Sequence, residues 1–308
     1  MVKKIKINIQ SDDKIQNKDT SILDFGGTLL QLETHSAQFR KGITKAEFEK
    51  FTQIQRNEWV KFSKQTIDKK HLIKINNIIS STRFYVIDAS LPFPIKGFYL
   101  IPNVSLEVVK NTLGGFILKL KRAVANFAKE YEQYIKEARE VLEKDGIFNI
   151  NDYPMNIHNR FSINYRFINL TVPSHINESM REKELIKFQQ MVRETRETGI
   201  LALRQGFADI ITNLADTLSG KLDGERKRLY QVSIDKVEQF FNSFKSKNLF
   251  HDNELENVIA NANDLLSGIS AKDLHNDIDL TKEINSQLKN VKTTLNSMIT
   301  NYKRKITI

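Results

Sequence analysis

Two short clusters of basic side chains are the residues of this sequence whose type and spacing most suggest a binding chemistry. They are Arg226, Lys227, Arg228, Lys303, Arg304 and Lys305. No apolar pattern demands that these residues be buried, so their charges could neutralise phosphates and release counterions. We therefore name them candidate nucleic-acid contacts. A phage or plasmid protein that binds DNA or RNA through basic surface patches is one function consistent with the sequence.

A second basic set is interleaved with aromatic residues, a combination used to bind single-stranded nucleic acid. The basic members are Lys119, Lys121, Arg122, Lys129 and Lys136, and the aromatic members are Phe116, Phe127, Tyr131 and Tyr134. The aromatic residues also follow the spacing of one helix face. We therefore interpret them as core residues rather than as a platform for bases.

Patterns for catalysis and metal binding are missing from the sequence. Its 6 His include no pair at the i, i+4 spacing of a zinc-binding helix, and it has no Cys. The tripeptide Asp24, Phe25, Gly26 lacks the other loops of a kinase. The acidic stretch around His275 lacks the Gly and the distal Glu of a calcium loop, so we interpret it as a polar loop between helices. We predict no catalytic residue, no cofactor and no metal site, and hence not an enzyme.

Composition narrows the class of protein further. The chain has 308 residues, of which 40% are hydrophobic, and a formal net charge of +10. This apolar content can build a sizeable core, which excludes wholesale disorder, and no apolar run approaches the roughly 18 residues of a membrane span. The basic start of the chain lacks the apolar segment of a signal peptide. We therefore expect a cytoplasmic protein with no membrane association.

Charge is segregated along the chain. Residues 61–130 carry a net +8, residues 251–280 a net −6 and residues 281–308 a net +5. Such segregation often reflects only a solvated surface, but opposite charges can also support a head-to-tail contact between copies. On the second interpretation we expect a homo-oligomer that dissociates as salt screens its charges.

The strongest structural pattern is a long apolar seam in the middle of the chain. Apolar residues from Leu106 to Val141 recur at steps of three and four over about five heptads. This spacing predicts a helix over about 105–144, which would be roughly 60 Å long. The glycine pair Gly114 and Gly115 predicts a close helix approach or a bend within it.

Helices also dominate the second half of the chain. Apolar residues from Leu185 to Leu218 predict a second long helix at about 176–218. Three further helices are expected at about 229–244, 252–266 and 280–302. Asp252 can cap the second of these, and Gly268 can close it.

The expected β structure is small. Alternating or β-prone runs predict strands at about 4–9, 29–32, 83–88, 97–101 and 160–169. Thr44 and Glu47 form a capping-box pattern that predicts the start of a helix. Its apolar face would carry Phe48, Phe51, Trp59 and Phe62, and a shorter helix would follow at about 69–80.

Together these elements predict a mostly α, elongated fold. We expect the two long helices to pair in an antiparallel hairpin or coiled coil, with a small β element at its base and a C-terminal helical bundle. The expected domains are an N-terminal α+β region at 1–100, the long helical hairpin with a strand in its connection at 101–222, and the bundle at 223–308.

A set of spaced patterns adds a resemblance to this picture. They lie at 30–35 with 39–41, at 83–87, at 97–103 with the long helix after it, at 161–167 and at 204–248. In this order they resemble a bacterial and phage family of unknown function. Its members are encoded beside MoxR- or cobaltochelatase-like AAA+ ATPases and von Willebrand A-domain proteins. The resemblance implies an association with an ATP-driven remodelling module, whose nucleotide chemistry would lie in the partner.

Two functions therefore follow from the sequence. The leading one is a non-enzymatic adaptor or structural subunit that self-assembles and works with an AAA+ ATPase and a von Willebrand A-domain protein. The alternative is the DNA- or RNA-binding protein described above. The apolar seams are more organised than the scattered basic residues, which favours the adaptor.

Overall fold

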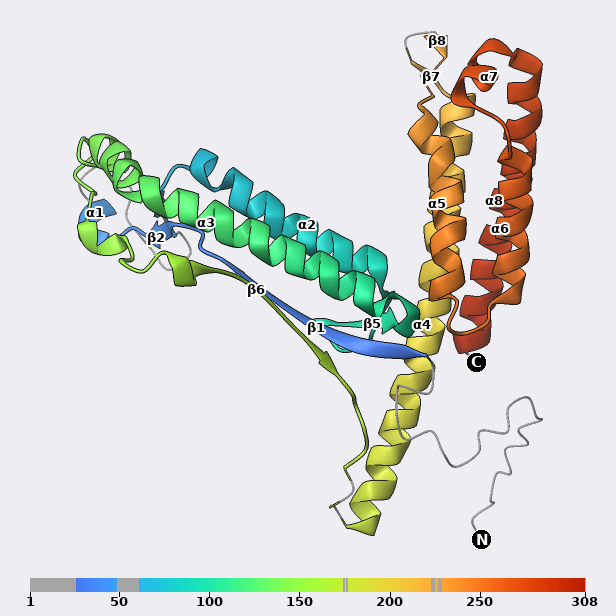
Figure 1. Cartoon of the computed structure of the whole chain (residues 1–308), viewed down its shortest axis with the longest axis horizontal. Helices are drawn as coiled ribbons and strands as arrows, with labels where there is room; N and C mark the ends of the chain where they lie inside the picture. The colour runs from blue at the N-terminus through green and yellow to red at the C-terminus, as the bar shows by residue number, and fades with distance from the viewer. Residues whose placement is uncertain are drawn as a thin grey trace. The chain divides into compact units, whose positions relative to one another are not determined.

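The computed structural model of this chain is mostly helical with a small antiparallel sheet (Figure 1). It describes residues 26–48, 61–173, 175, 177–222, 225–226 and 229–307. The chain divides into two compact units. The sheet unit comprises the described residues of 30–91 and 95–167, and the bundle unit comprises the other described residues.

Four strands form the sheet, in the order β4-β5-β1-β6. Their bounds are Gly27–Ser36 for β1, Leu91–Pro92 for β4, Phe98–Pro102 for β5 and Phe161–Ile168 for β6. The inner strand β1 pairs on both sides, because Leu32 N donates to Gly97 O at 3.2 Å and Ala37 N donates to Arg160 O at 3.0 Å. β6 therefore forms one edge of the sheet. The strands expected at 29–32, 97–101 and 160–169 are confirmed.

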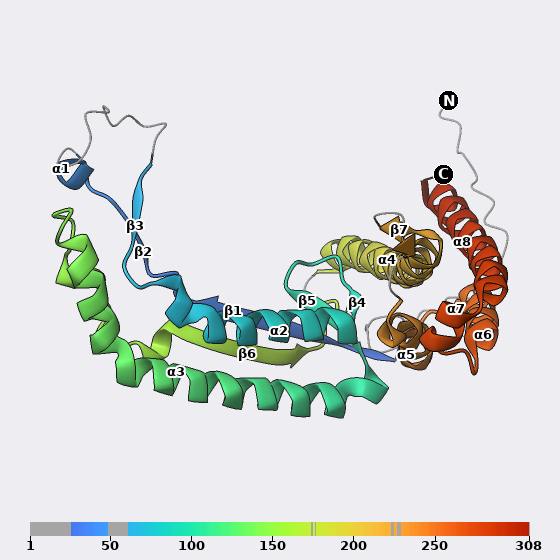
Figure 2. The same ribbon diagram turned by 90° about the horizontal axis from the view of Figure 1, so that it is seen from above.

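Two helices lie side by side on one face of this sheet (Figure 1 and Figure 2). Helix α2 spans Ile73–Ala89 after a 3-10 turn at Lys69–Leu72, and α3 spans Leu106–Leu142 after a 3-10 turn at Asn103–Ser105. The buried residues that they share with the strands include Ile75, Ile79, Val86, Val109, Leu113, Leu120, Val124, Phe127, Phe161 and Ile163. This apolar layer holds the sheet unit together.

The expected strand at 83–88 is wrong, because these residues lie within α2. Ile75, Ile79, Thr82 and Val86 are the buried residues of this helix, and they recur at steps of four, three and four. This helical spacing outweighs the local β preference of the run that follows Arg83. The strand β5 therefore pairs with β4 and β1 instead.

The helix expected after Thr44 begins as predicted. Helix α1 spans Lys45–Phe48, where Glu47 N donates to Thr44 Oγ1 at 3.2 Å and Thr44 N donates to Glu47 Oε2 at 2.7 Å. Phe62 does not belong to this helix, because its carbonyl accepts a hydrogen bond from Ile43 N at 3.0 Å. The expected strand at 4–9 and two members of the expected helix face, Phe51 and Trp59, lie outside the described residues.

Three short segments complete the sheet unit. Strand β2 at Arg40–Gly42 pairs antiparallel with β3 at Ser63–Gln65. The connection from α3 to β6 contains 3-10 turns at Ile150–Asp152 and His158–Arg160. This connection brings Asp152 close to β3, and the polar network there is described below.

The bundle unit consists of helices around its own apolar core. Its elements are α4 at Glu178–Ser219, β7 at Lys221–Leu222, β8 at Glu225–Arg226, α5 at Gln231–Lys247, α6 at Asn253–Leu266, α7 at Ala271–Asn276 and α8 at Ile278–Thr307. Helix α4 packs against α8 and α5, while α6 packs against α5 and α8.

The expected helices are confirmed, and Asp252 caps α6 by accepting a hydrogen bond from Leu255 N at 3.2 Å. The stretch around His275 was expected as a loop, but it is largely the helix α7, which begins with a capping box at Ser270 and Asp273.

The expected hairpin of the two long helices requires correction. Both helices form, but α3 packs against α2 in the sheet unit and α4 packs against α8 in the bundle unit. Of the close helix approach or bend expected at Gly114 and Gly115, the close approach is not found, since no side chain or distant backbone of the described residues would lie within 4 Å of a Cβ atom added to either glycine. The apolar face of α3 is thus covered by α2, and that of α4 by α8. The seam pattern did not indicate either helix as the partner.

Candidate interaction site

An exposed apolar stripe runs along the outer face of α2. Ile73, Phe84 and Ile87 expose 56%, 71% and 56% of their surface, respectively. Their offsets of 11 and 14 residues correspond to about three and four helical turns, so the three side chains lie near one face. Asn77 and Ser80 lie between them on the same face and are exposed. We call Ile73, Phe84 and Ile87 the α2 stripe.

Helix α2 is therefore apolar on two sides. Its inner face packs Ile75, Ile79 and Val86 into the core, whereas its outer face leaves Phe84 and Ile87 in solvent. A helix that covers a sheet needs only one apolar face, and the opposite face is normally polar. Clustered exposed apolar groups are typical of surfaces that bind another protein.

Two further exposed apolar residues lie at the same end of the α2–α3 pair. Val104, in the 3-10 turn before α3, and Val108, in the first turn of α3, expose 79% and 64% of their surface. They are close to the end of α2 that carries Phe84, because Val86 and Val109 share one core cluster. Phe84, Ile87, Val104 and Val108 thus lie at one end of the two helices, while Ile73, Leu118 and Val141 are exposed elsewhere along them.

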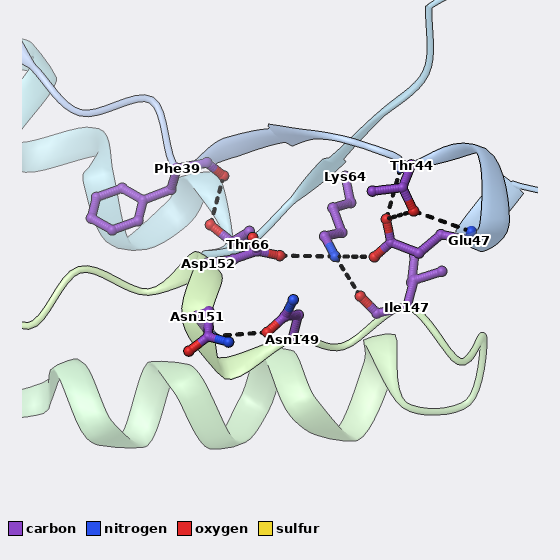
Figure 3. A network of polar contacts seen from close by, with 9 residues as sticks. All are labelled: Phe39, Thr44, Glu47, Lys64, Thr66, Ile147, Asn149, Asn151 and Asp152. Atoms are coloured by element: carbon purple, nitrogen blue, oxygen red, sulfur yellow. Dashed lines mark hydrogen bonds and ion pairs between the residues drawn. The ribbon is translucent and has the colours of Figure 1, made fainter.

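A buried lysine organises the other end of the sheet unit. The Nζ atom of Lys64 lies 2.7 Å from Glu47 Oε1, 2.8 Å from Asp152 Oδ2 and 2.6 Å from Ile147 O (Figure 3). Burial acts to lower the pKa of Lys64, but the hydrogen bonds and charges of Asp152 and Glu47 outweigh it and raise that pKa. The hydrogen bond from Lys64, together with one from the Thr44 backbone, lowers the pKa of Glu47 to about 2.

We call Lys64 together with Glu47, Asp152 and Ile147 the Lys64 cluster, and these contacts give it a structural role. An ammonium group has three donors, and here each has an acceptor. Beside it, Thr66 donates to Phe39 O from both its N, at 2.7 Å, and its Oγ1, at 3.0 Å (Figure 3). The cluster ties β3 and α1 to the connection after α3, and it leaves no donor of Lys64 for a substrate.

A second buried charge stabilises the bundle unit. Arg204 of α4 donates to both carboxylate oxygens of Asp252, at 2.7 and 2.8 Å, and to Glu254 Oε2 at 3.0 Å. It also donates to Met298 O at 3.1 Å and lies over the ring of Tyr302 at 5.1 Å. The hydrogen bond to Asp252 raises the pKa of this guanidinium. Arg204 therefore joins α4, the start of α6 and α8.

The six candidate nucleic-acid contacts fall into different parts of the bundle unit. Lys303 and Arg304 are exposed near the end of α8, and Lys305 lies in the same helix. Arg226 lies in β8, and Lys227 and Arg228 are outside the described residues. The side chains of Arg226 and Lys305 are also outside the described part.

The direction of α4 and α8 separates the two clusters. Arg204 is joined to Met298, while Asp216, further along α4, lies 3.7 Å from Lys292, which is earlier in α8. The two helices are thus antiparallel, so the end of α8 and the β7–β8 hairpin lie at opposite ends of the pair (Figure 1). Within the described part of the chain, strand β8 with Arg226 is therefore remote from Lys303 and Arg304 at the end of α8.

The described residues contain no group of three His, Asp or Glu side chains that could hold a metal ion. Among their helices, none combines the length and apolar character of a membrane span. The sequence alone did not single out Lys64, which is flanked by the polar residues Ser63 and Gln65, or Arg204. It also assigned Phe84 and Ile87 to a strand, which concealed the exposed face of α2.

Comparisons of the chain with protein-family models, with curated proteins and with solved structures found no match. The resemblance described from the sequence therefore remains an expectation.

Proposed function

We propose that this chain is a cytoplasmic, non-enzymatic adaptor or structural subunit that self-associates and works with an AAA+ ATPase remodelling module. The observation that carries this proposal is the α2 stripe. Ile73, Phe84 and Ile87 lie exposed on one helix face, and Val104 and Val108 lie at the end of α2 that carries Phe84 and Ile87. A protein partner that covered these side chains would remove a large apolar area from water.

The composition of the stripe suits a protein partner better than a small ligand. Phe84 is a large aromatic side chain on a convex helix, and aromatic anchors dominate the binding energy of many interfaces. Small molecules are usually enclosed in concave pockets. A second copy or an ATPase subunit could present the complementary groove.

The two buried charge clusters support a structural role for the chain. Lys64 and Arg204 each have carboxylate partners and a backbone carbonyl acceptor. Catalytic groups usually need an open position beside a perturbed side chain. The named partners, an AAA+ ATPase and a von Willebrand A-domain protein, come from the sequence resemblance alone.

The experiment combines Phe84→Glu with Ile87→Glu and compares this variant with Val141→Glu. Val141 is 61% exposed near the other end of α3, so it provides a matched charge outside the stripe. Sedimentation velocity would measure self-association, and affinity capture from the native host would measure retention of the AAA+ ATPase. We expect the stripe variant to lose both and the control to keep both.

Two results would overturn the proposal. One is that the wild-type chain is itself a monomer and captures no ATPase. The other is a stripe variant that associates and captures as well as the wild type.

DNA or RNA binding is the second proposal, and exposed Lys303 and Arg304 support it. Their separation from Arg226 weakens the case for one continuous nucleic-acid surface. Tight, salt-sensitive binding of DNA or RNA, with no ATPase recovered from the native host, would favour this alternative.

A further inference from the structure

Strand β6 presents an open edge of the sheet. It is the last strand in the order β4-β5-β1-β6, so within the described part of the chain its second side has no strand partner. Ala37 N donates to Arg160 O, which fixes the register. In an antiparallel ladder the inward and outward backbone groups alternate. The N–H and C=O groups of Phe161, Ile163, Tyr165 and Phe167 therefore point away from β1.

Helix α3 flanks this open edge and creates a groove beside it. A cavity of about 440 Å³ lies between the two elements. It is lined by Ile117, Leu120, Lys121 and Val124 of α3, and by His158, Phe161, Ser162, Ile163 and Asn164. The floor is apolar, and one wall consists of the strand whose backbone is open. An extended chain in this groove could form main-chain hydrogen bonds on one side and bury alternate side chains.

The charges around the groove are basic. Lys121 and His158 line it, and no carboxylate does so among the described residues. Arg122 and Arg160, next to the lining residues, are exposed. This charge favours an acidic occupant and disfavours a basic one.

We propose that β6 receives an extended acidic segment of a partner protein as an added strand, held between β6 and α3. Alternate apolar side chains of the segment enter the groove over Leu120 and Val124. Acidic side chains at the intervening positions point away from α3, and the positive charge of Lys121 beside the groove attracts them through space without a direct ion pair. Strand addition of this kind takes affinity from main-chain hydrogen bonds and specificity from pockets for alternate side chains. The proposal rests on the adaptor function and adds a second, separate surface to the α2 stripe.

The probe is a fluorescein-labelled peptide of about ten residues in which Val and Glu alternate, followed by anisotropy. A peptide with Lys in place of Glu tests the charge. Two peptides N-methylated at alternate positions, one in each register, test the backbone. We expect the Val–Glu peptide to bind, the Val–Lys peptide to fail, and only one methylated register to lose about tenfold or more in affinity.

Variants of the full chain locate the binding. Lys121→Glu should weaken the Val–Glu peptide by about tenfold, whereas Lys129→Glu, an exposed change on the same helix, should not. Phe167→Pro removes an outward N–H near the end of the edge strand, where proline is tolerated, and Phe167→Ala controls for the lost ring. We expect the Pro variant to bind more weakly than the Ala variant.

Three outcomes would refute this groove. They are no binding of the Val–Glu peptide, equal loss from both methylated registers, and equal effects of Lys121→Glu and Lys129→Glu. A dimer that Phe167→Pro dissociates would instead mean that a second copy occupies the edge. If Lys121→Glu binds the Val–Glu peptide as well as the wild type does, while the stripe variant loses ATPase capture, the adaptor function stands and the groove proposal fails.

Discussion

At the scale of single residues, buried charge in this chain stabilises junctions between elements. Lys64 closes the junction between β3, α1 and the connection after α3, because its three donors reach Glu47, Asp152 and Ile147 O. Arg204 plays the same part where α4, α6 and α8 meet. Both residues have small exposed fractions, so removal of either leaves carboxylates without a counter-charge.

The first prediction concerns the acid stability of the Lys64 cluster. The folded chain lowers the pKa of Glu47 from 4.5 to about 2. A lowered pKa contributes stability that is complete above the unfolded value and is lost as the pH falls toward the folded value. The free energy of unfolding should therefore fall between pH 4.5 and about 2. Glu47→Gln should be less stable at pH 7 and should lose less stability over that interval. Denaturant titrations at several pH values would show this, and parallel pH profiles would contradict it.

The second prediction concerns Arg204. Its side chain and that of Asp252 are 7% and 3% exposed. Arg204→Ala should reduce the free energy of unfolding by about 3–5 kcal/mol, the range for breaking a buried ion pair. Lys282→Ala, which removes an exposed pair with Asp279, should change it little. Urea unfolding of both variants is the measurement, and similar midpoints would show that the Arg204 pair is not structurally important.

At the scale of elements, the third prediction uses the seam of α3. Val124 is 4% exposed, whereas Val141, in the same apolar repeat, is 61% exposed. Val124→Asp should cost several kcal/mol because it places an unpaired charge in the core. Val141→Asp should have little effect on the melting temperature. Equal melting of the two variants would mean that the core of the sheet unit is placed incorrectly.

Much of the element pattern follows from the sequence, whereas the pairing of elements does not. The repeat from Leu106 to Val141 correctly predicts α3, since helical spacing over many turns is unambiguous. A seam specifies that a partner exists but not which helix supplies it, so α3 and α4 were wrongly paired with each other. The short run after Arg83 combines β-prone residues with a helical period, and the period is visible only together with Ile75 and Ile79.

The candidate site was predicted less well than the fold. Lys303 and Arg304 are exposed, as their polar surroundings indicate. The α2 stripe could not be recognised, because apolar residues in a sequence indicate burial unless the packing of the helix is known. The open edge of β6 depends on the strand order, which no local pattern contains.

At the scale of the whole molecule, the fourth prediction separates basic charge from protein association. Replacement of the six residues Arg226, Lys227, Arg228, Lys303, Arg304 and Lys305 by Gln should leave self-association and ATPase capture largely intact, because the α2 stripe lies in the other unit. The melting temperature should also change little. Sedimentation and capture at two salt concentrations would test this. Loss of both self-association and ATPase capture would indicate that the interface lies in the bundle unit instead.

The most direct test of the central claim is site-specific photocrosslinking from the α2 stripe. A benzoyl-phenylalanine placed at Phe84 would be irradiated in the native host, with the same group at Val141 as the matched exposed control. We predict crosslinks from position 84 to a second copy or to the AAA+ ATPase, identified by mass spectrometry, and none from position 141. An absence of crosslinks at position 84, or the same products from both positions, would contradict the claim that the α2 stripe is a protein interface.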